Sequence, residues 1–116
     1  MSRIYHIASA ADWRDARSTS SYEAATLRAE GFIHCSTREQ VVPVADAFFR
    51  GVAGLVLMEI DPEKLDAELR FEENVGPDGE IGRFPHVYGP ISVAAVVAVH
   101  ALAPQADGSF TFPGVE

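Results

Sequence analysis

Three histidines, His6, His34 and His86, each stand in a short stretch that is typical of an extended strand. An imidazole changes its charge near neutral pH, so it can accept or donate a proton, and the neutral ring also binds metal ions. Aromatic or hydroxyl residues accompany the three histidines in the sequence, namely Tyr5, Ser36 and Tyr88. If the fold brings the imidazoles together, they line a pocket for acid-base chemistry or ligand binding.

Few carboxylates and cations are placed to complete such a pocket. Glu59 and Glu72 interrupt or end otherwise apolar strands, so each is a candidate general base. We predict Glu72 as the catalytic carboxylate, together with His34 and His86. Arg38 follows a polar motif and would attract a phosphate or a carboxylate group. For each charged residue the alternative is a solvated surface position.

Two other chemistries have weaker support from the spacing. Cys35 is the single cysteine, and strand alternation turns its neighbour His34 to the opposite face, so we expect a buried core thiol rather than a nucleophile. Three histidines also form a common zinc set, but zinc ligands usually lie close together in the sequence, and these three do not. We therefore expect no metal. His100 lies in a late strand without polar company, and we expect it to be structural.

The stretch 31–37, Gly-Phe-Ile-His-Cys-Ser-Thr, connects the end of a helix, a strand and the start of the next helix. Gly31 is the expected end of the first helix. In the strand, alternation places His34 and Ser36 on one face and Ile33 and Cys35 on the other. A polar face is thereby laid opposite a buried one.

A second helix start follows this stretch directly. Ser36 and Thr37 each stand three residues before an acid or an amide, which is the spacing of a capping box. One of the two caps the amphipathic helix expected at 38–49, and the other is left for a ligand. A helix N-terminus attracts anions, so Thr37 and Arg38 join the predicted binding residues. Pro43 should kink this helix or delay its start.

Periodicity and turn residues predict the remaining elements. We expect a helix at 10–17 capped by Ser9, and a second helix capped by Ser20. Gly and Pro residues at 73–83 predict a mobile surface loop that could act as a lid. Phe110 to Phe112 could pair back on the last strand. Strands or extended segments are expected at 3–8, 55–60, 69–72, 84–90 and 94–102, and a helical turn at 61–65.

Composition limits the class of protein. The 116 residues, 47% of them apolar, suit one domain with its own core, so we expect a single α+β domain over 1–116. A formal net charge of -8 argues against binding of extended nucleic acid. One cysteine and the absence of a long apolar run predict a cytoplasmic protein without a membrane contact. We expect a monomer or a weak homodimer.

Four motifs resemble the small bacterial family of unknown function DUF952. They are Tyr-His-Ile at 5–7, the stretch 31–37 followed by Gln40, the apolar strand that ends at Asp61, and Phe-Pro-His-Val-Tyr-Gly-Pro at 84–90. The order and spacing of these motifs extend over nearly the whole chain. The family name itself implies no activity.

The layout also resembles the ADP-ribosyltransferase-like fold, and within it the transferase that removes a 2'-phosphate from RNA with NAD. That resemblance implies two short, roughly orthogonal sheets with flanking helices and a nucleotide cleft between them. It implies that His6 holds the ribose and that His34 and Ser36 line the cleft, which His86 and Tyr88 close. The arginines that hold phosphorylated RNA in that enzyme group have no counterpart here.

Three functions are therefore compatible with the sequence. The first is binding of NAD, ADP-ribose or a related nucleotide, with ADP-ribosyl transfer as an added step. The second is a non-catalytic module for a small anionic metabolite, and the third is a metal-dependent hydrolase built on three histidines. The predicted ligand-binding residues are His6, Ser36, Thr37, Arg38, Phe84 and Tyr88.

Overall fold

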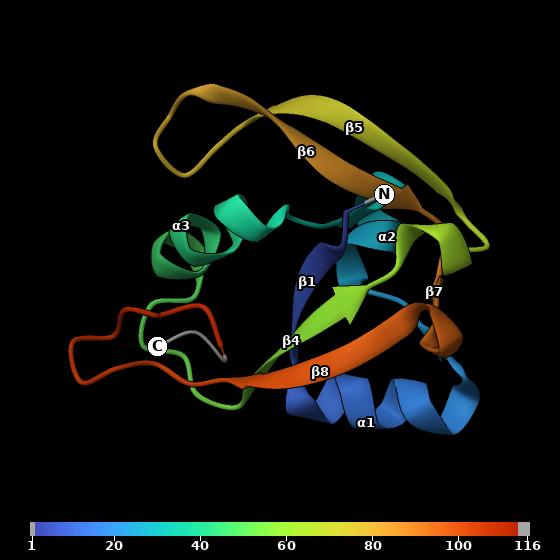
Figure 1. Ribbon diagram of the computed structural model, residues 1–116, viewed down its shortest axis with the longest axis horizontal. Helices are drawn as coiled ribbons and strands as arrows, with labels where there is room; N and C mark the ends of the chain where they lie inside the picture. Colours follow the sequence, from blue (N-terminus) through green and yellow to red (C-terminus); the bar gives the residue numbers. More distant parts are fainter. Residues whose placement is uncertain (1, 114–116) are drawn as a thin grey trace.

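A computed structural model of the chain describes residues 2–113 and contains three antiparallel sheets with helices on their outer faces (Figure 1). The fold is α+β, as predicted. The strands are β1 Ile4–Ser9, β2 Ser21–Tyr22, β3 Ile33–His34, β4 Leu55–Ile60, β5 Glu68–Val75, β6 Ile81–Tyr88, β7 Ile91–Ser92 and β8 Val96–Leu102. The helices are α1 Ala10–Thr19, α2 Ala25–Glu30 and α3 Arg38–Phe48, with short 3-10 turns η1 Pro62–Lys64 and η2 Val93–Ala95.

The first sheet has the order β1-β4-β8. Strand β4 lies in the middle, and four of its six residues are buried, as expected for a central strand with a nearly continuous apolar sequence. Glu59 is the exception in this strand. Its carboxylate bonds to His100 (3.1 Å) and lies near Arg3, so both Glu59 and His100 have polar company at the sheet surface. The prediction that His100 lacks polar neighbours was wrong.

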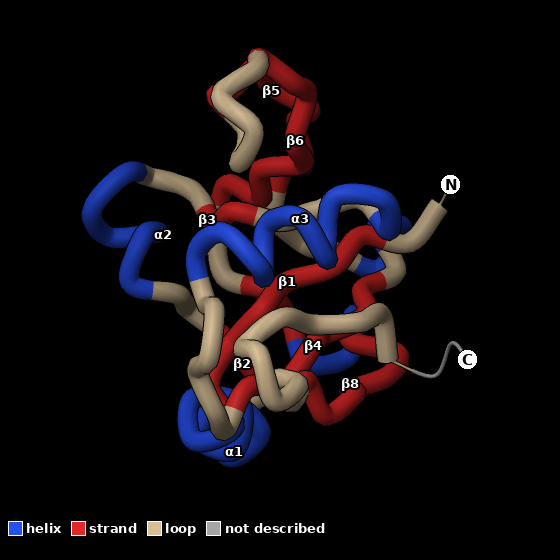
Figure 2. Tube along the Cα trace, turned by 90° about the vertical axis from the view of Figure 1, so that its left-hand side faces the viewer, coloured by secondary structure: helices blue, strands red, loops and turns tan. Residues whose placement is uncertain are grey.

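The second sheet has the order β3-β6-β5, and the long β5-β6 hairpin extends away from the body of the protein (Figure 2). The prediction of a mobile loop at 73–83 was wrong. Both strands run through that range, and only a turn remains, closed by a hydrogen bond from Gly76 N–H to Glu80 O (2.8 Å). Polar residues fill this part of the hairpin because much of it faces solvent, which hides the strand pattern in the sequence.

A two-stranded ribbon, β2-β7, is the third sheet and was not predicted. Ser20 precedes it with a left-handed φ of 67° and ends α1, so the prediction that Ser20 caps the second helix was wrong. The Ser9 cap of α1 is confirmed, because the hydroxyl of Ser9 accepts from Asp12 N–H (3.0 Å). Gly31, at φ 89°, ends α2 as predicted.

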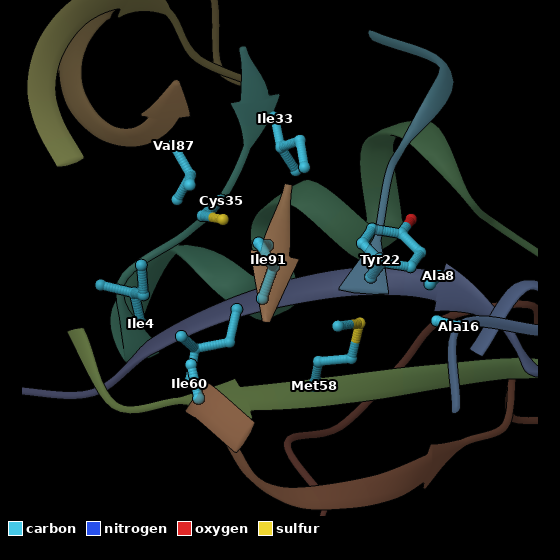
Figure 3. Packing of buried hydrophobic residues seen from close by; sticks show 11 residues of the cluster. Ile4, Ala8, Ala16, Tyr22, Ile33, Cys35, Met58, Ile60, Val87 and Ile91 are labelled. Atoms are coloured by element: carbon cyan, nitrogen blue, oxygen red, sulfur yellow. The ribbon is translucent and has the colours of Figure 1, made fainter. Parts of the chain in front are cut away.

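Two hydrophobic clusters hold the sheets together. The larger one lies between the first sheet and the second, where Ile33, Cys35 and Val87 face Met58 and Ile60 (Figure 3). The smaller cluster lies under α3. Tyr5 and Leu57 belong to it, together with Val41, Ala45, Leu55, Leu102 and Phe110. Every residue of these clusters is less than 9% exposed.

The C-terminal aromatic residues act differently from the prediction. Phe110 to Phe112 do not pair with β8. Instead, Phe110 is buried in the smaller cluster and its N–H donates to the carboxylate of Asp46 on α3 (2.7 Å), while Phe112 packs edge-on against Tyr5. The turn at Asp107 and Gly108 favours a hairpin with the last strand, but tertiary packing decides the conformation of this segment. No helix within residues 2–113 is long and apolar enough to cross a membrane.

Candidate functional site

A cavity of about 590 Å³ lies between β1, α3 and the tip of the β5-β6 hairpin. Apolar side chains from β1 and α3 form most of its wall, and the hairpin segment from Asn74 to Pro77 forms one side of it. His34 of β3 and the following residues Cys35 and Ser36 contribute to the wall. Ile33 and Cys35 are buried in the larger hydrophobic cluster, as predicted from strand alternation, although Cys35 also touches the cavity.

Two hydroxyl-bearing residues of the cavity wall have no hydrogen-bond partner for their side chains within residues 2–113. The hydroxyl oxygen of Thr26 lies in the wall, is buried, and has no hydrogen-bond partner among the described residues. The hydroxyl of Ser36 likewise has no side-chain hydrogen bond within residues 2–113. A buried hydroxyl normally has a partner, so these two groups provide hydrogen-bonding capacity that the described part of the fold leaves unused. No lysine or arginine belongs to the described wall, and Asp12 is its carboxylate.

His6 belongs to the cavity wall, and both of its ring nitrogens are bonded within the fold. Its Nδ1–H donates to the backbone oxygen of His34 (2.6 Å), because a carbonyl can only accept. In the neutral ring Nε2 is then an acceptor, and the hydroxyl of Tyr22 donates to it (2.8 Å). Burial lowers the pKa of His6 from 6.5 to about 4, so the ring is neutral at pH 7. His6 therefore fixes the backbone of His34.

His86 is the centre of a second group of residues beside the cavity, which we call the His86 cluster: Phe32, Glu72, His86 and Tyr88. The Nδ1–H of His86 donates to Oε1 of Glu72 (2.9 Å), and the hydroxyl of Tyr88 donates to the same oxygen. These two donors lower the pKa of Glu72, with Tyr88 as the larger cause. The second nitrogen of His86, Nε2, is buried and has no partner in the described chain.

Phe32 covers His86. Its ring stacks on the imidazole with the centroids 4.2 Å apart and the planes at 20°. Tyr88 also contacts Phe32, and the guanidinium of Arg70 lies 4.6 Å from the centre of the Tyr88 ring. As a result His86 is only 3% exposed, and it does not line the cavity. The arrangement resembles a carboxylate-histidine pair in which the carboxylate fixes the tautomer.

His34 belongs to both places. It lines the cavity, and its ring meets the ring of His86 edge-on at 5.3 Å, which follows from their direct pairing between β3 and β6. Its Nε2 lies 3.2 Å from Glu30 at the end of α2. The Nδ1 atom has no partner within the described residues. His34 is thus the residue through which the cavity and the His86 cluster are in contact.

Comparison with known proteins identifies the family. The family model described as "Protein of unknown function (DUF952)" matches residues 7–99. The chain belongs to the DUF952 family. A crystal structure of protein CC0527 from Caulobacter crescentus is similar, with 38% identity and a TM-score of 0.82 over 95% of this chain and 94% of that chain. A solution NMR structure of CC0527 matches with 38% identity and a TM-score of 0.72 over 94% of this chain and 91% of that one.

A search of functionally curated proteins finds no match to this chain. The site of this DUF952 protein must therefore be interpreted from its own geometry. The predicted residues fall into three groups. His6, His34, Ser36 and Phe84 line the cavity, while Glu72, His86 and Tyr88 form the His86 cluster. Thr37 and Arg38 belong to neither.

Thr37 and Arg38 lie at the start of α3. Thr37 is the N-cap residue, and its N–H donates to the side chain of Gln40 (3.0 Å), so the predicted cap is confirmed for Thr37 and Ser36 is the residue left over. The guanidinium of Arg38 lies 4.3 Å from the centre of the Phe112 ring. It faces the C-terminal segment and not the cavity. Pro43 is accommodated inside α3.

Two further predictions concern metal and thiol chemistry. The three histidines do not converge on one point, because His6 uses both nitrogens within the fold. No group of three or more His, Cys, Asp or Glu side chains in the described part of the chain could hold a metal ion. Cys35 is buried in the larger cluster, as predicted, and burial raises the pKa of its thiol.

Three residues of the cavity wall and the His86 cluster have no signal in the sequence that was used to predict the site. Thr26 lies on a short helix without a motif, and Tyr22 lies in a strand of two residues that no periodicity can reveal. Phe32 was part of the quoted stretch, but its ring was not assigned a role. The sequence signal for Phe32 is the run of aromatic residues around His86, because aromatic rings in a core pack against other aromatic rings.

Proposed function

We propose that this chain binds a nucleotide of the NAD or ADP-ribose type, with the uncharged nucleoside end of the ligand in the cavity. The observation that carries the proposal is the wall of the cavity, which is largely apolar and contains His34 together with Thr26 and Ser36, two residues whose hydroxyls have no partner within residues 2–113. A nucleoside combines a flat ring with several hydroxyl groups. Its ring fits the apolar part of the wall, and its hydroxyls fit the polar atoms.

Size and charge support this orientation of the ligand. About 590 Å³ lies within the usual range for small-molecule sites, about 300–1,000 Å³. Because no lysine or arginine belongs to the described wall, and because the chain has a net charge of -8, a diphosphate gains little there. The phosphates of the ligand therefore extend toward solvent. The resemblance to the ADP-ribosyltransferase-like fold supports the choice of an NAD-type ligand.

The same geometry favours binding over transfer. Transfer of an ADP-ribosyl group needs groups that stabilise the developing charge on the ribose. The predicted carboxylate, Glu72, has one oxygen bonded to two donors in the His86 cluster, and neither Glu72 nor His86 lines the cavity. We therefore assign His34 to ligand contact, His6 to positioning of His34, and no catalytic role to Glu72.

Isothermal titration calorimetry tests the proposal with NAD, ADP-ribose and adenosine. We expect saturable binding of at least one of them. The Thr26→Val variant keeps the shape of the side chain but loses the hydroxyl, so it should bind about threefold to tenfold more weakly. Thr111→Val is the matched control, because Thr111 is exposed and lies outside the cavity wall, and its affinity should be unchanged.

Two results would contradict the proposal. Absence of any heat of binding with all three ligands would refute nucleotide binding. Equal weakening by Thr26→Val and Thr111→Val would show that the ligand binds elsewhere. Incubation with NAD addresses transfer separately: we expect no release of nicotinamide above the buffer control, and release that depends on Glu72 would overturn the assignment of binding without transfer.

A further inference from the structure

Strand β5 is an open edge of the second sheet. It has eight residues, pairs with β6 on one side, and is the last strand in the sheet order β3-β6-β5 (Figure 1). An edge strand of this length presents a row of backbone donors and acceptors that a further strand can bind. The charges of the β5 side chains determine which strand can pair with this edge.

Two backbone hydrogen bonds establish which backbone groups of the hairpin face outward. At the turn, Gly76 N–H donates to Glu80 O (2.8 Å), and on the far side of β6, Cys35 N–H from β3 donates to Pro85 O (2.9 Å). Residues alternate in an antiparallel ladder between the two neighbouring strands. The even-numbered residues of β5 therefore bond to β6. The backbone groups of Leu69, Phe71, Glu73 and Val75 face the open edge.

The even-numbered side chains of β5 carry a charge pattern next to this edge. Arg70 bonds to Glu68 through two nitrogens (2.8 and 3.1 Å). Glu72 receives both of its donors, from His86 and Tyr88, on the single oxygen Oε1. Its other oxygen, Oε2, has no partner within residues 2–113. One carboxylate oxygen is therefore available to a cation that approaches the edge.

Only one register allows a second copy of β5 to bring such a cation. In a two-fold symmetric antiparallel pair, outward-facing residues must oppose outward-facing residues. If Arg70 opposes itself, two arginines meet and Glu68 opposes Glu72. If Glu72 opposes itself, two carboxylates meet. If Phe71 opposes itself, Arg70 of each copy opposes Glu72 of the other, so both cross-strand pairs have opposite charges.

We propose that β5 pairs with β5 of a second copy of this chain in the register centred on Phe71. The two three-stranded sheets then form one sheet of six strands. Arg70 of each copy faces the unpartnered Oε2 of Glu72 in the other, and thereby adds a cation beside the His86 cluster. The two Phe71 rings, each 38% exposed in the single chain, meet on the opposite face.

The dimer is weak and depends on concentration, for a reason visible at the edge itself. Arg83 reaches across the hairpin, and its guanidinium donates to the outward oxygen of Phe71 (2.8 Å). This contact must open before a second strand can bind there. The net charge of -8 on each copy also weakens association, because the two copies repel each other. Association should therefore be strongest at a salt concentration that screens this long-range repulsion but leaves the short Arg70-Glu72 pairs in place.

Analytical ultracentrifugation of the full chain, from micromolar to millimolar protein, tests the proposal. We expect a monomer-dimer equilibrium. Arg70→Glu and Glu72→Arg should each weaken dimerisation at least tenfold, because each puts like charges opposite one another. The double variant with both reversals should restore the affinity of the natural chain to within about threefold. Arg14→Glu, an exposed reversal on α1, is the matched control and should leave dimerisation unchanged.

A proline variant tests the strand pairing without relying on Glu72. Phe71→Pro removes a backbone N–H that faces outward, so the ladder to β6 stays intact while the symmetric pair loses both central hydrogen bonds between the copies. We expect loss of the dimer with an unchanged circular dichroism spectrum. A natural chain that is monomeric at every concentration overturns the proposal. So does a dimer that tolerates Phe71→Pro, and single reversals without rescue in the double variant overturn the register.

Discussion

The cavity and the His86 cluster share one residue, His34, yet they have opposite characters. The cavity is open, and two hydroxyls in its wall lack partners. The His86 cluster holds a carboxylate, an imidazole and a phenol in direct contact, but Phe32 covers it. In this protein the cavity that could hold a ligand lies next to the His86 cluster, but the groups of that cluster that could exchange protons do not line the cavity. Proximity of histidines to a cavity is thus not sufficient evidence of catalysis.

Two buried imidazoles show the same contrast at the level of single atoms. His6 is 9% exposed and His86 is 3% exposed, so burial does not distinguish them. Their hydrogen bonds do. Both nitrogens of His6 are bonded within the fold, whereas Nε2 of His86 has no partner among the described residues. His6 is a structural support, and His86 retains an unused acceptor.

The largest expected effect comes from replacing these two imidazoles in the same way. His6→Phe leaves the oxygen of His34 and the hydroxyl of Tyr22 buried without partners, so the free energy of unfolding should fall by about 4 kcal/mol. His86→Phe keeps the ring stack with Phe32 but removes the Nδ1–H bond to Glu72 as well as the unpartnered Nε2. Because Glu72 is partly exposed and keeps its bond from Tyr88, the free energy of unfolding should fall by about 1–2 kcal/mol, less than in His6→Phe. Urea denaturation of the two variants measures both values.

The comparison between the two imidazoles fails if these losses are equal. A loss for His86→Phe as large as that for His6→Phe would mean that Nε2 of His86 does have a partner, such as an ordered water. Crystallographic analysis of the variants would then locate that partner. A small loss for His6→Phe would mean that the His34 backbone is held by the strand pairing alone.

The second expected effect is the acid sensitivity that His6 confers. An unfolded imidazole takes up a proton near pH 6.5, whereas burial lowers the pKa of folded His6 to about 4. Between these values the unfolded state binds more protons, so stability is complete above pH 6.5 and is lost as the pH falls. The free energy of unfolding should decrease by about 3 kcal/mol between pH 7 and pH 4 from this residue.

His6→Asn provides the control for this pH dependence. The side-chain amide of asparagine can still donate to the oxygen of His34 but does not titrate. The free energy of unfolding of His6→Asn should be lower at pH 7, and its dependence on pH should lack the part that His6 contributes. The slope that remains belongs to carboxylates such as Glu72, whose pKa is lowered in the fold. An unchanged slope between pH 7 and pH 5 would assign the acid sensitivity to another group.

The stretch 31–37 was predictable because local rules decide it. Alternation along a strand correctly predicted that Ile33 and Cys35 are buried in the core, and the capping spacing correctly marked Thr37 as the N-cap of α3. These features depend on residues within a few positions of one another. The same holds for Gly31, whose left-handed φ of 89° follows from the missing side chain.

The partners of the histidines were not predictable, because long-range pairing decides them. His6 bonds to the backbone of a residue 28 positions away, and His86 to a carboxylate 14 positions away on a strand whose second half was predicted as a loop. Only the β5-β6 register brings Glu72 to His86. The sequence therefore indicated which side chains could do chemistry, but it could not tell that His6 has no free nitrogen.

The smallest expected effect concerns the shared oxygen of Glu72. Tyr88→Phe removes the hydroxyl that is the larger cause of the lowered pKa of Glu72, while His86 still donates to the carboxylate. The pKa of Glu72 should therefore rise toward its ordinary value but stay below it, and the fold should persist. A carbon-detected NMR titration of the Glu72 carboxyl group measures this change.

Leu69→Val, a nearby substitution that changes no charge, is the control for this titration. If the pKa of Glu72 does not move in Tyr88→Phe, His86 alone sets the charge of the His86 cluster, and its contrast with the cavity then depends on a single hydrogen bond.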